Sequence, residues 1–178
     1  IVVGAPAADH GRITAAIAKR PGEGGERVVV DTAAGDHAIT AYRVCERAGR
    51  RAAWLALEPQ TGRTHQLRVH CLALGTPILG DGKYGGRDAF LAEIGDATRL
   101  HLHSRAIAFP HPAGGICRIV APLPAHLRAS WAFFGFGEES TRETLAHWPD
   151  DGDGAAPGRR RGAGSIAAPR ALRHRKGK

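Results

Sequence analysis

Apolar and polar residues alternate along several short stretches of this chain, which is the pattern of strands with a buried face. In residues 37–47, every second residue from Ala38 to Val44 falls on one face, and in residues 50–60 apolar side chains occupy both faces. The segment RAGRR joins the two stretches and contains the glycine of a turn. The pattern therefore predicts an antiparallel hairpin.

The rest of the chain adds more short strands and a few helices. The pattern predicts strands at residues 1–4, 26–31, 99–112 and 114–124, and helices at residues 64–75, 89–96 and 124–136. Residues 11–20 combine an apolar stripe with a glycine and a β-branched pair, so both strand and helix stay open. Strands and helices without regular alternation indicate an α+β domain with a mixed, mostly antiparallel sheet. No apolar run approaches the ~18 residues that span a bilayer, so no membrane partner is expected.

The predicted helix at residues 64–75 carries the most distinctive side chains. Thr64 is a good N-cap and Gly75 is a good C-cap. The apolar face is made by residues at i, i+4 and i+7, namely Leu67, Cys71 and Leu74. The adjacent face holds His65, Arg68 and Leu72. Arg68 should therefore be mostly buried.

An arginine on a buried face needs an anion, because burial cannot neutralise a guanidinium. A structural salt bridge or extension to the surface would meet this need, and so would a catalytic carboxylate or a phosphate. Spacing alone leaves these alternatives open. Arg63 and Thr64 begin the helix, where backbone N–H groups attract anions, and this suits an RNA phosphate.

Two other segments contain groups that could do chemistry. Residues 76–86, TPILGDGKYGG, lack the spacing of a phosphate-binding loop and predict a tight turn, with Asp81 as a turn residue. His101 and His103 would share one face of a strand, which could suit a metal, but no carboxylate or cysteine stands beside them at ligand spacing. We therefore favour structural or RNA-facing histidines, expect no metal, and keep a metal-dependent hydrolase as a minor alternative.

The cysteines indicate the compartment. Cys45, Cys71 and Cys117 are odd in number, far apart and flanked by apolar residues. This spacing favours buried free thiols over a disulfide framework or a metal site. We therefore expect a reducing, cytoplasmic setting. As a separate expectation, the protein is a monomer.

Positive charge is concentrated at the end of the chain. Residues 1–150 hold 17 Lys and Arg against 15 Asp and Glu, a net of +2, whereas residues 151–178 hold 8 Lys and Arg against 2 Asp, a net of +6. The latter segment is rich in Gly, Ala and Pro and should be disordered when free. We divide the chain into a folded domain, residues 1–149, and a basic tail, residues 150–178. The tail is either an arm that attracts RNA phosphates or a solvated bystander.

One long motif resembles a known family. The sequence PQTGRTHQLRVHCLALGTPILGDGKYG closely resembles the most characteristic motif of the RluA family of pseudouridine synthases. The resemblance extends, in the family's order, to IVVGAPAADHGRI, GDHAITAYRV, RLHLHSRAIAFPHP and CRIVAPLP. It covers about residues 1–128 and leaves the tail without a counterpart.

The resemblance implies an isomerase that converts chosen uridines of rRNA or tRNA to pseudouridine without a cofactor. Such enzymes flip the target base out of its stack and act on it with an aspartate. Arg68 matches the family arginine that pairs with this catalytic aspartate. Arg63, Thr64 and His65 match the turn that precedes the arginine helix and are expected to bind RNA. The apolar support positions of the motif are matched by Leu67 and Val69.

The chain also departs from the family pattern. The catalytic aspartate of the family lies in a His-Arg-Leu-Asp segment that belongs upstream of Ile1, together with the active-site tyrosine, and Asp81 and Tyr84 are not their counterparts. We therefore expect the C-terminal part of a catalytic domain, inactive on its own, with Arg68 lining an open cleft, unpaired or bound to a stand-in anion. The alternative is a catalytically inactive RNA-binding module.

Overall fold

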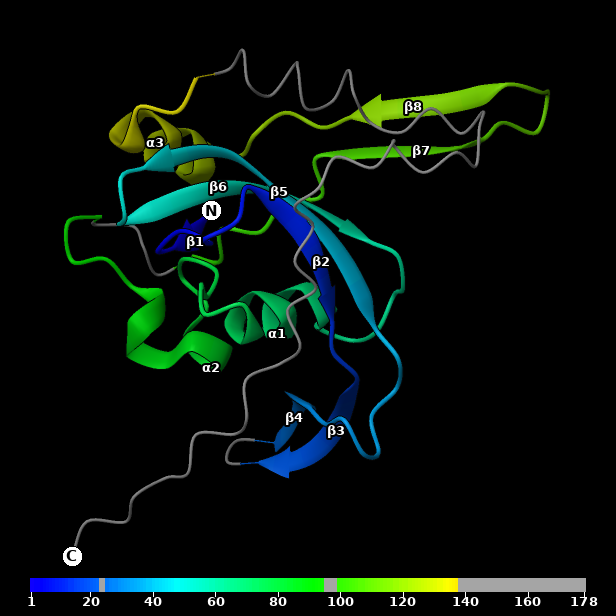
Figure 1. Ribbon diagram of the computed structural model, residues 1–178. Helices are drawn as coiled ribbons and strands as arrows, with labels where there is room; N and C mark the ends of the chain where they lie inside the picture. The colour runs from blue at the N-terminus through cyan, green and yellow to red at the C-terminus, as the bar shows by residue number, and fades with distance from the viewer. Residues whose placement is uncertain (23–24, 95–98, 138–178) are drawn as a thin grey trace, which may run out of the picture.

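Four strands form an antiparallel sheet in the spatial order β1-β6-β5-β2 (Figure 1). In the computed structural model, which describes residues 1–22, 25–94 and 99–137, these strands are β1 (Val2–Val3), β6 (Ala52–Pro59), β5 (Ile39–Ala48) and β2 (His10–Thr14). The pair β5–β6 is the hairpin predicted from the alternation. All strand pairs of the described residues are antiparallel, which agrees with the predicted α+β class.

Two further hairpins and four helical segments complete the described chain. The hairpins are β3 (Ile17–Gly22) with β4 (Gly25–Val30), and β7 (Ala106–Pro110) with β8 (Ile116–Val120). The helical segments are α1 (Gln66–Ala73), α2 (Gly82–Gly85), the 3-10 turn η1 (Gly86–Ala89) and α3 (Ala125–Phe134). Within the described ranges, no helix has the length and apolar character to cross a membrane.

Strand β6 is covered on both faces, and this places the helices on opposite sides of the sheet. On one face Trp54 packs on Trp131 of α3, with 4.7 Å between the ring centroids. On the other face Leu55 packs with Cys71 of α1. Figure 1 shows α3 on one side of the sheet and α1 with α2 on the other. Apolar residues on both faces of the segment, as the sequence shows, thus reflect its central position.

Residues 11–20, for which strand and helix both stayed open, form parts of two strands, β2 and β3. The chain leaves the sheet between them, where the N–H of Ala15 donates to the carbonyl of Ala38 at 3.2 Å. The β3–β4 hairpin then folds toward α1, and Ile17 and Val28 pack with Val69 of α1. This hairpin therefore packs beside α1, the helix that carries Arg68.

Helix α1 is shorter than predicted. Its first residue is Gln66 rather than one just after Thr64, because His65 adopts a left-handed conformation (φ 52°). Its end is close to the prediction. Gly75 has φ 82° and its N–H donates to Leu72 O at 2.9 Å, while the N–H of Thr76 donates to Cys71 O at 3.1 Å. This pair of bonds is a Schellman motif.

The buried face of α1 is also rotated from the predicted one. Cys71 is buried as expected, but Leu67 and Leu74 are only half-buried. Gln66 and His70 are buried instead. The apolar spacing was misleading here because two polar side chains are buried with hydrogen-bond partners.

Three predicted elements were wrong in place or type. The helix predicted at residues 89–96 is absent from its described part, apart from Ala89, which ends the 3-10 turn η1. Helix α2 lies inside the segment predicted as a loop, residues 76–86, and η1 begins at the last residue of that segment. Residues 99–105 are not a strand, and β7 begins only at Ala106. Residues 95 and 96, the end of the predicted domain at 138–149 and the basic tail lie outside the described residues. Helix α3 is confirmed, with Leu127 and Trp131 buried.

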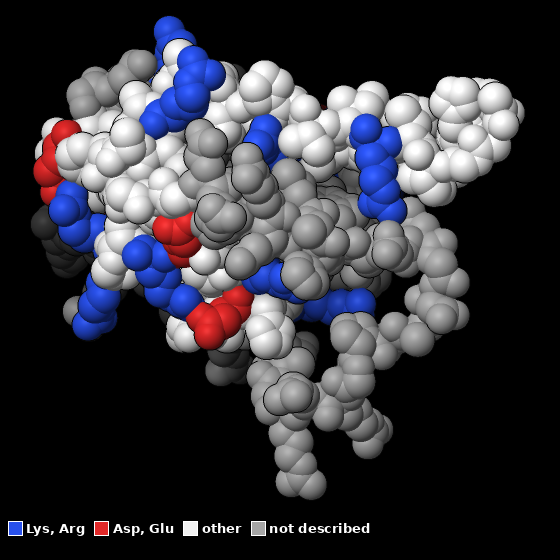
Figure 2. All heavy atoms as spheres, turned by 90° about the horizontal axis from the view of Figure 1, so that it is seen from above, with Lys and Arg blue, Asp and Glu red and all other residues white. Residues whose placement is uncertain are grey.

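The β7–β8 hairpin exposes a broad apolar surface. Ile107, Ile119 and Val120 are each about half exposed, at 54%, 51% and 52%. Figure 2 shows the hairpin as a projection whose surface is almost entirely uncharged. A two-stranded hairpin is only marginally stable alone. The β7–β8 hairpin therefore contributes little to the stability of the domain, whose buried core lies around β6.

The three cysteines form no disulfide with one another, as predicted. Cys71 is fully buried, whereas Cys45 and Cys117 are half-buried, so the expectation of buried thiols holds fully for one of them. The cytoplasmic location stays a prediction.

Candidate active site

A side-chain network fixes the turn that leads from β6 into α1. Gln66 is buried, and its Nε2 donates to the carbonyl of Ile39 at 2.9 Å and to Thr40 Oγ1 at 3.0 Å. Its Oε1 accepts from the hydroxyl of Thr61 at 2.7 Å and from the N–H of Arg63 at 3.1 Å. All four hydrogen-bonding positions are satisfied in a buried setting, so the start of α1 is held to β5.

The network continues inward through His70, which is fully buried. Its Nε2 lies 3.0 Å from the carbonyl of Ala15, so Nε2 carries the proton and donates. Its Nδ1 then accepts from the hydroxyl of Thr40 at 2.9 Å. Burial lowers the pKa of His70, which keeps the ring neutral in this arrangement. One buried chain of hydrogen bonds thus joins α1 to β5 and to the end of β2.

Arg68 is paired with Asp81 of this chain, so the expectation that it would be unpaired or bound to a stand-in anion was wrong. Its Nε donates to Asp81 Oδ2 at 2.9 Å and its Nη2 donates to Asp81 Oδ1 at 2.6 Å. The Asp81 side chain is 1% exposed and the Arg68 side chain is 18% exposed, so solvent does not reach the carboxylate but does reach part of the arginine. The bidentate hydrogen bond raises the pKa of Arg68 further above its ordinary value.

Asp81 can make this pair because it begins a helical turn. It is the N-cap of α2, and Oδ1 also accepts from the N–H of Tyr84 at 3.2 Å. An aspartate three residues before that N–H is the N-cap spacing, and this signal could have predicted the helical turn. It could not have predicted the pair, because the approach of Asp81 to Arg68 depends on the path of residues 76–80.

Asp81 uses only part of the guanidinium. An arginine has five N–H donors, and Asp81 takes one from Nε and one from Nη2. Among the described residues, no hydrogen bond joins Nη1. The exposed edge of Arg68 therefore has donors available for a second anion.

Arg63 and Thr64 face a surface hollow whose lining does not include Arg68. Both are exposed, and with Lys19 and Arg20 of β3 they line a surface hollow of about 480 Å³. Arg63 Nη1 is 3.7 Å from Asp36, and both side chains are largely exposed, so this pair contributes little. The predicted RNA-binding residues thus occupy a solvent-facing hollow between the β3–β4 hairpin and the turn.

His65 lies between this turn and α1. It is exposed, and its Nδ1 is 2.7 Å from the hydroxyl oxygen of Tyr84. Among the described residues it is the one non-glycine residue with positive φ. Desolvation, together with the positive charges of Arg68 and Lys83, lowers the pKa of His65.

The two predicted support positions differ in burial. Val69 is 2% exposed and packs with Ile17, Val28 and Tyr84. Leu67 is only half-buried. Val69 therefore connects α1 to the β3–β4 hairpin, and the support role of Leu67 stays a prediction.

The alternative of a histidine metal site finds no support in the described part of the chain. His101 is buried, its Nε2 lies 2.7 Å from Ser130 Oγ, and its Nδ1 lies 2.7 Å from the carbonyl of Arg99. Both nitrogens are thus in use, and His103 is outside any strand. No group of three candidate metal ligands occurs among the described residues.

Known proteins of similar sequence share one activity in their names. The family described as RNA pseudouridylate synthase matches residues 1–73. The chain is 40% identical over 126 residues to ribosomal large subunit pseudouridine synthase D of Xylella fastidiosa, covering 66% of the chain and 37% of that protein. It is 48% identical over 81 residues to the dual-specificity RNA pseudouridine synthase RluA of Salmonella typhi, covering 46% of the chain and 35% of that protein.

The fold is also similar to a solved structure. The human RNA pseudouridylate synthase domain containing 1 superposes with a TM-score of 0.56 and 30% identity, covering 69% of this chain and 52% of that one. The chain spans little more than a third of the length of the two relatives named above.

Proposed function

Because this chain belongs to the RluA family of RNA pseudouridine synthases, we propose that its protein converts selected uridines of structured RNA to pseudouridine. In this reaction the bond from N1 of the base to C1′ of the ribose breaks, and a bond from C5 to C1′ forms. The C5 hydrogen leaves as a proton, and N1 takes up a proton. The base keeps its composition, so the reaction needs no redox partner.

The observation that carries this proposal is the half-used guanidinium of Arg68. Asp81 holds one edge of it through two hydrogen bonds, which fixes the direction of the remaining donors. A second carboxylate that meets the open edge would be held in its ionised form beside a permanent positive charge. We assign this position to the catalytic aspartate that the family motif leads us to expect outside these 178 residues.

Asp81 itself is unsuited to act on the ribose. Its two oxygens already accept from Arg68 and from the N–H of Tyr84, and the side chain is 1% exposed. It therefore orients Arg68, and a different carboxylate performs the chemistry.

The turn before α1 supplies the contacts to RNA in this proposal. Arg63 and Thr64 face solvent at the hollow, and His65 is exposed beside them. A guanidinium and a hydroxyl suit phosphate oxygens. Ribosomal RNA is the first target to test, because the Xylella relative is named for the large ribosomal subunit, and tRNA is the second.

The direct test uses the complete protein and RNA labelled with tritium at C5 of uridine. Formation of the C5–C1′ bond releases tritium to water, so the released label reports turnover. We expect release by the wild type and a loss of at least about 100-fold in Arg68→Lys, because lysine keeps the charge but not the planar fork that binds two carboxylates.

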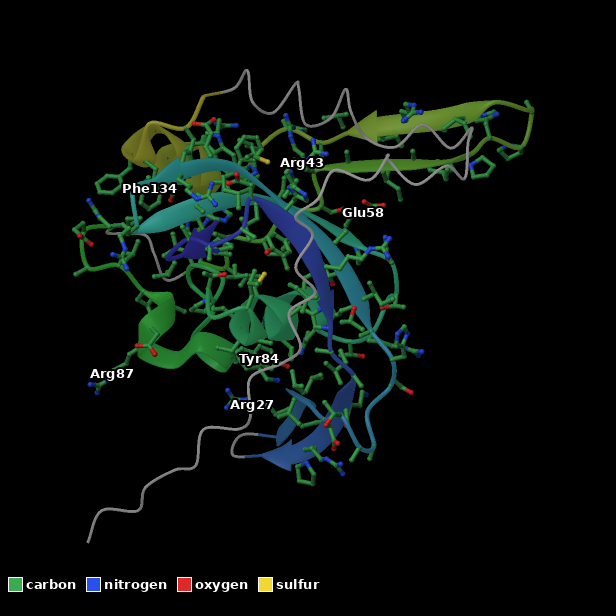
Figure 3. The ribbon with its side chains drawn as sticks, in the orientation of Figure 1. Arg27, Arg43, Glu58, Tyr84, Arg87 and Phe134 are labelled. Atoms are coloured by element: carbon green, nitrogen blue, oxygen red, sulfur yellow. The ribbon has the colours of Figure 1, made fainter. Side chains whose placement is uncertain are left out.

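The matched control is Arg87→Lys. Arg87 is exposed on η1, and its side chain points away from the body in Figure 3. It should keep wild-type release. Wild-type release in Arg68→Lys would contradict the role of Arg68, and RNA binding without release by the wild type would favour an inactive binding module.

A further inference from the structure

Tyr84 is a buried phenol in contact with the arginine pair. It lies between α1 and the β3–β4 hairpin, with Arg27 next to it (Figure 3). Its ring packs with Val28 and Val69, and only 5% of the residue is exposed. The packing fixes the ring, so the groups that touch it contact a rigid part of the structure.

The ring supports the guanidinium of Arg68 from its face. Arg68 Cζ is 4.7 Å from the Tyr84 ring centroid, within the range of a cation–π contact. Asp81 fixes the guanidinium within its own plane, through two parallel hydrogen bonds. The ring thus gives the guanidinium a second contact, in addition to the carboxylate.

The hydroxyl of Tyr84 determines the tautomer of His65. The phenol oxygen accepts from the N–H of Val28 at 3.4 Å. His65 Nδ1, at 2.7 Å, is the acceptor found for the phenol hydrogen among the described residues, so the hydroxyl donates to it. An Nδ1 that accepts carries no proton, so the neutral ring carries its proton on Nε2. No partner for Nε2 is found among the described residues, and His65 is exposed. The ring therefore offers an N–H donor to solvent.

The backbone of His65 shows that this position is held. A left-handed conformation is unfavourable for a residue with a Cβ. It persists where surrounding contacts determine it. The bond to Tyr84 and the Gln66 network on the following residue are such contacts.

We propose that Tyr84 is a positioning residue that orients the guanidinium of Arg68 with its ring and fixes His65, with its hydroxyl, as an Nε2–H donor to an acceptor oxygen of RNA. The part of this proposal that concerns activity rests on the proposed function. The part that concerns the His65 tautomer does not.

The tautomer is tested by ¹⁵N chemical shifts of the histidine rings in the complete protein, at a pH where His65 is neutral. We expect the Nε2–H tautomer for His65 in the wild type and a mixture of the two tautomers in Tyr84→Phe. An Nδ1–H tautomer in the wild type, or an unchanged spectrum in Tyr84→Phe, would overturn the proposal whatever the activity of the protein.

The kinetic test separates the two contacts of Tyr84 by tritium release. Tyr84→Phe keeps the ring and removes the hydroxyl, so KM should rise about 5-fold, the effect of one hydrogen bond, with kcat unchanged. Tyr84→Leu removes the ring as well, and kcat should fall about 10-fold. If Tyr84→Leu fails to fold, Tyr84→Phe alone carries the test.

Coupling is measured with His65→Ala and the double variant His65→Ala/Tyr84→Phe. We expect the double variant to raise KM no more than His65→Ala alone, because the hydroxyl acts through the imidazole. If the two substitutions instead multiply each other's effect on KM, the hydroxyl acts on a group other than His65. An inactive wild type with the expected tautomer would refute the proposed reaction but not the positioning by Tyr84.

Discussion

At the scale of single residues, Asp81 determines where the guanidinium of Arg68 points. A carboxylate that is 1% exposed and bound to two nitrogens of one arginine leaves that arginine few orientations. The pair also satisfies two charges that could not be left alone in the interior. The same contact thus stabilises the chain and orients the exposed N–H donors of Arg68.

Replacing Asp81 by asparagine should therefore destabilise the chain. The neutral amide keeps the shape but leaves Arg68 without an anion and turns a donor toward a donor. We expect a loss of about 2–3 kcal/mol in the free energy of unfolding, measured by urea titration. Asp88→Asn, at an exposed aspartate of η1, is the control and should change stability by less than about 0.5 kcal/mol.

At the scale of elements, the end of α1 decides where the chain turns toward Asp81. Gly75 ends the helix with φ 82°, and the two hydrogen bonds of the Schellman motif close its last turn. Residues 76–80 then run back beside β1, where the N–H of Val3 donates to Pro77 O at 2.8 Å. The helix end and this strand contact together bring Asp81 alongside Arg68.

Two glycines, one on either side of α1, allow the effect of backbone conformation on stability to be distinguished from the effect of steric space. A Cβ added at Gly75 or at Gly62 would meet no atom within 4 Å, but only Gly75 has a positive φ. Gly75→Ala should therefore lower the free energy of unfolding by about 1–2 kcal/mol, the cost of a left-handed alanine. Gly62→Ala should be neutral or slightly stabilising. Equal effects in thermal or urea unfolding would contradict this account of the helix end.

At the scale of the whole molecule, buried neutral histidines couple stability to pH. His70 joins α1 to the sheet and His101 joins residue 79 to α3, and burial lowers the pKa of both. The unfolded chain takes up protons at the ordinary value near 6.5, above the folded-state pKa. Their contribution to stability is thus complete above about pH 6.5 and is lost as the pH falls toward the folded-state pKa.

We expect the free energy of unfolding to decrease between about pH 7.5 and 5.5, by at most about 1.4 kcal/mol per pH unit for each histidine. In His70→Asn the chain should be less stable at the higher pH and the slope should be smaller. His10→Asn, at an exposed position, should keep the wild-type slope. Identical slopes in all three proteins would exclude His70 as a source of the pH dependence.

The sequence predicts local features better than the contacts between distant segments. The β5–β6 hairpin follows from the alternation along β5 and the glycine turn that joins it to β6. Helix α3 follows from its one buried face. The need of Arg68 for an anion follows from charge and burial. The identity of its partner does not follow from the sequence, because Asp81 reaches Arg68 only through the path of residues 76–80. The burial of Gln66 and His70 was missed for a related reason. Their partners are distant in the sequence: Thr40 lies on β5, and Ala15 lies between β2 and β3.

The order of synthesis gives the arginine pair a further property. Every contact described for Arg68, His65 and the Gln66 network uses residues up to Tyr84, so no later segment is needed to build it. Trp131, which covers the other face of β6, leaves the ribosome a few seconds later at typical rates of about 5–20 residues per second. The contacts of the arginine can thus form while α3 is still being made. A defect in α3 would reach them through the sheet or through residue 79, which His101 joins to Ser130 of α3.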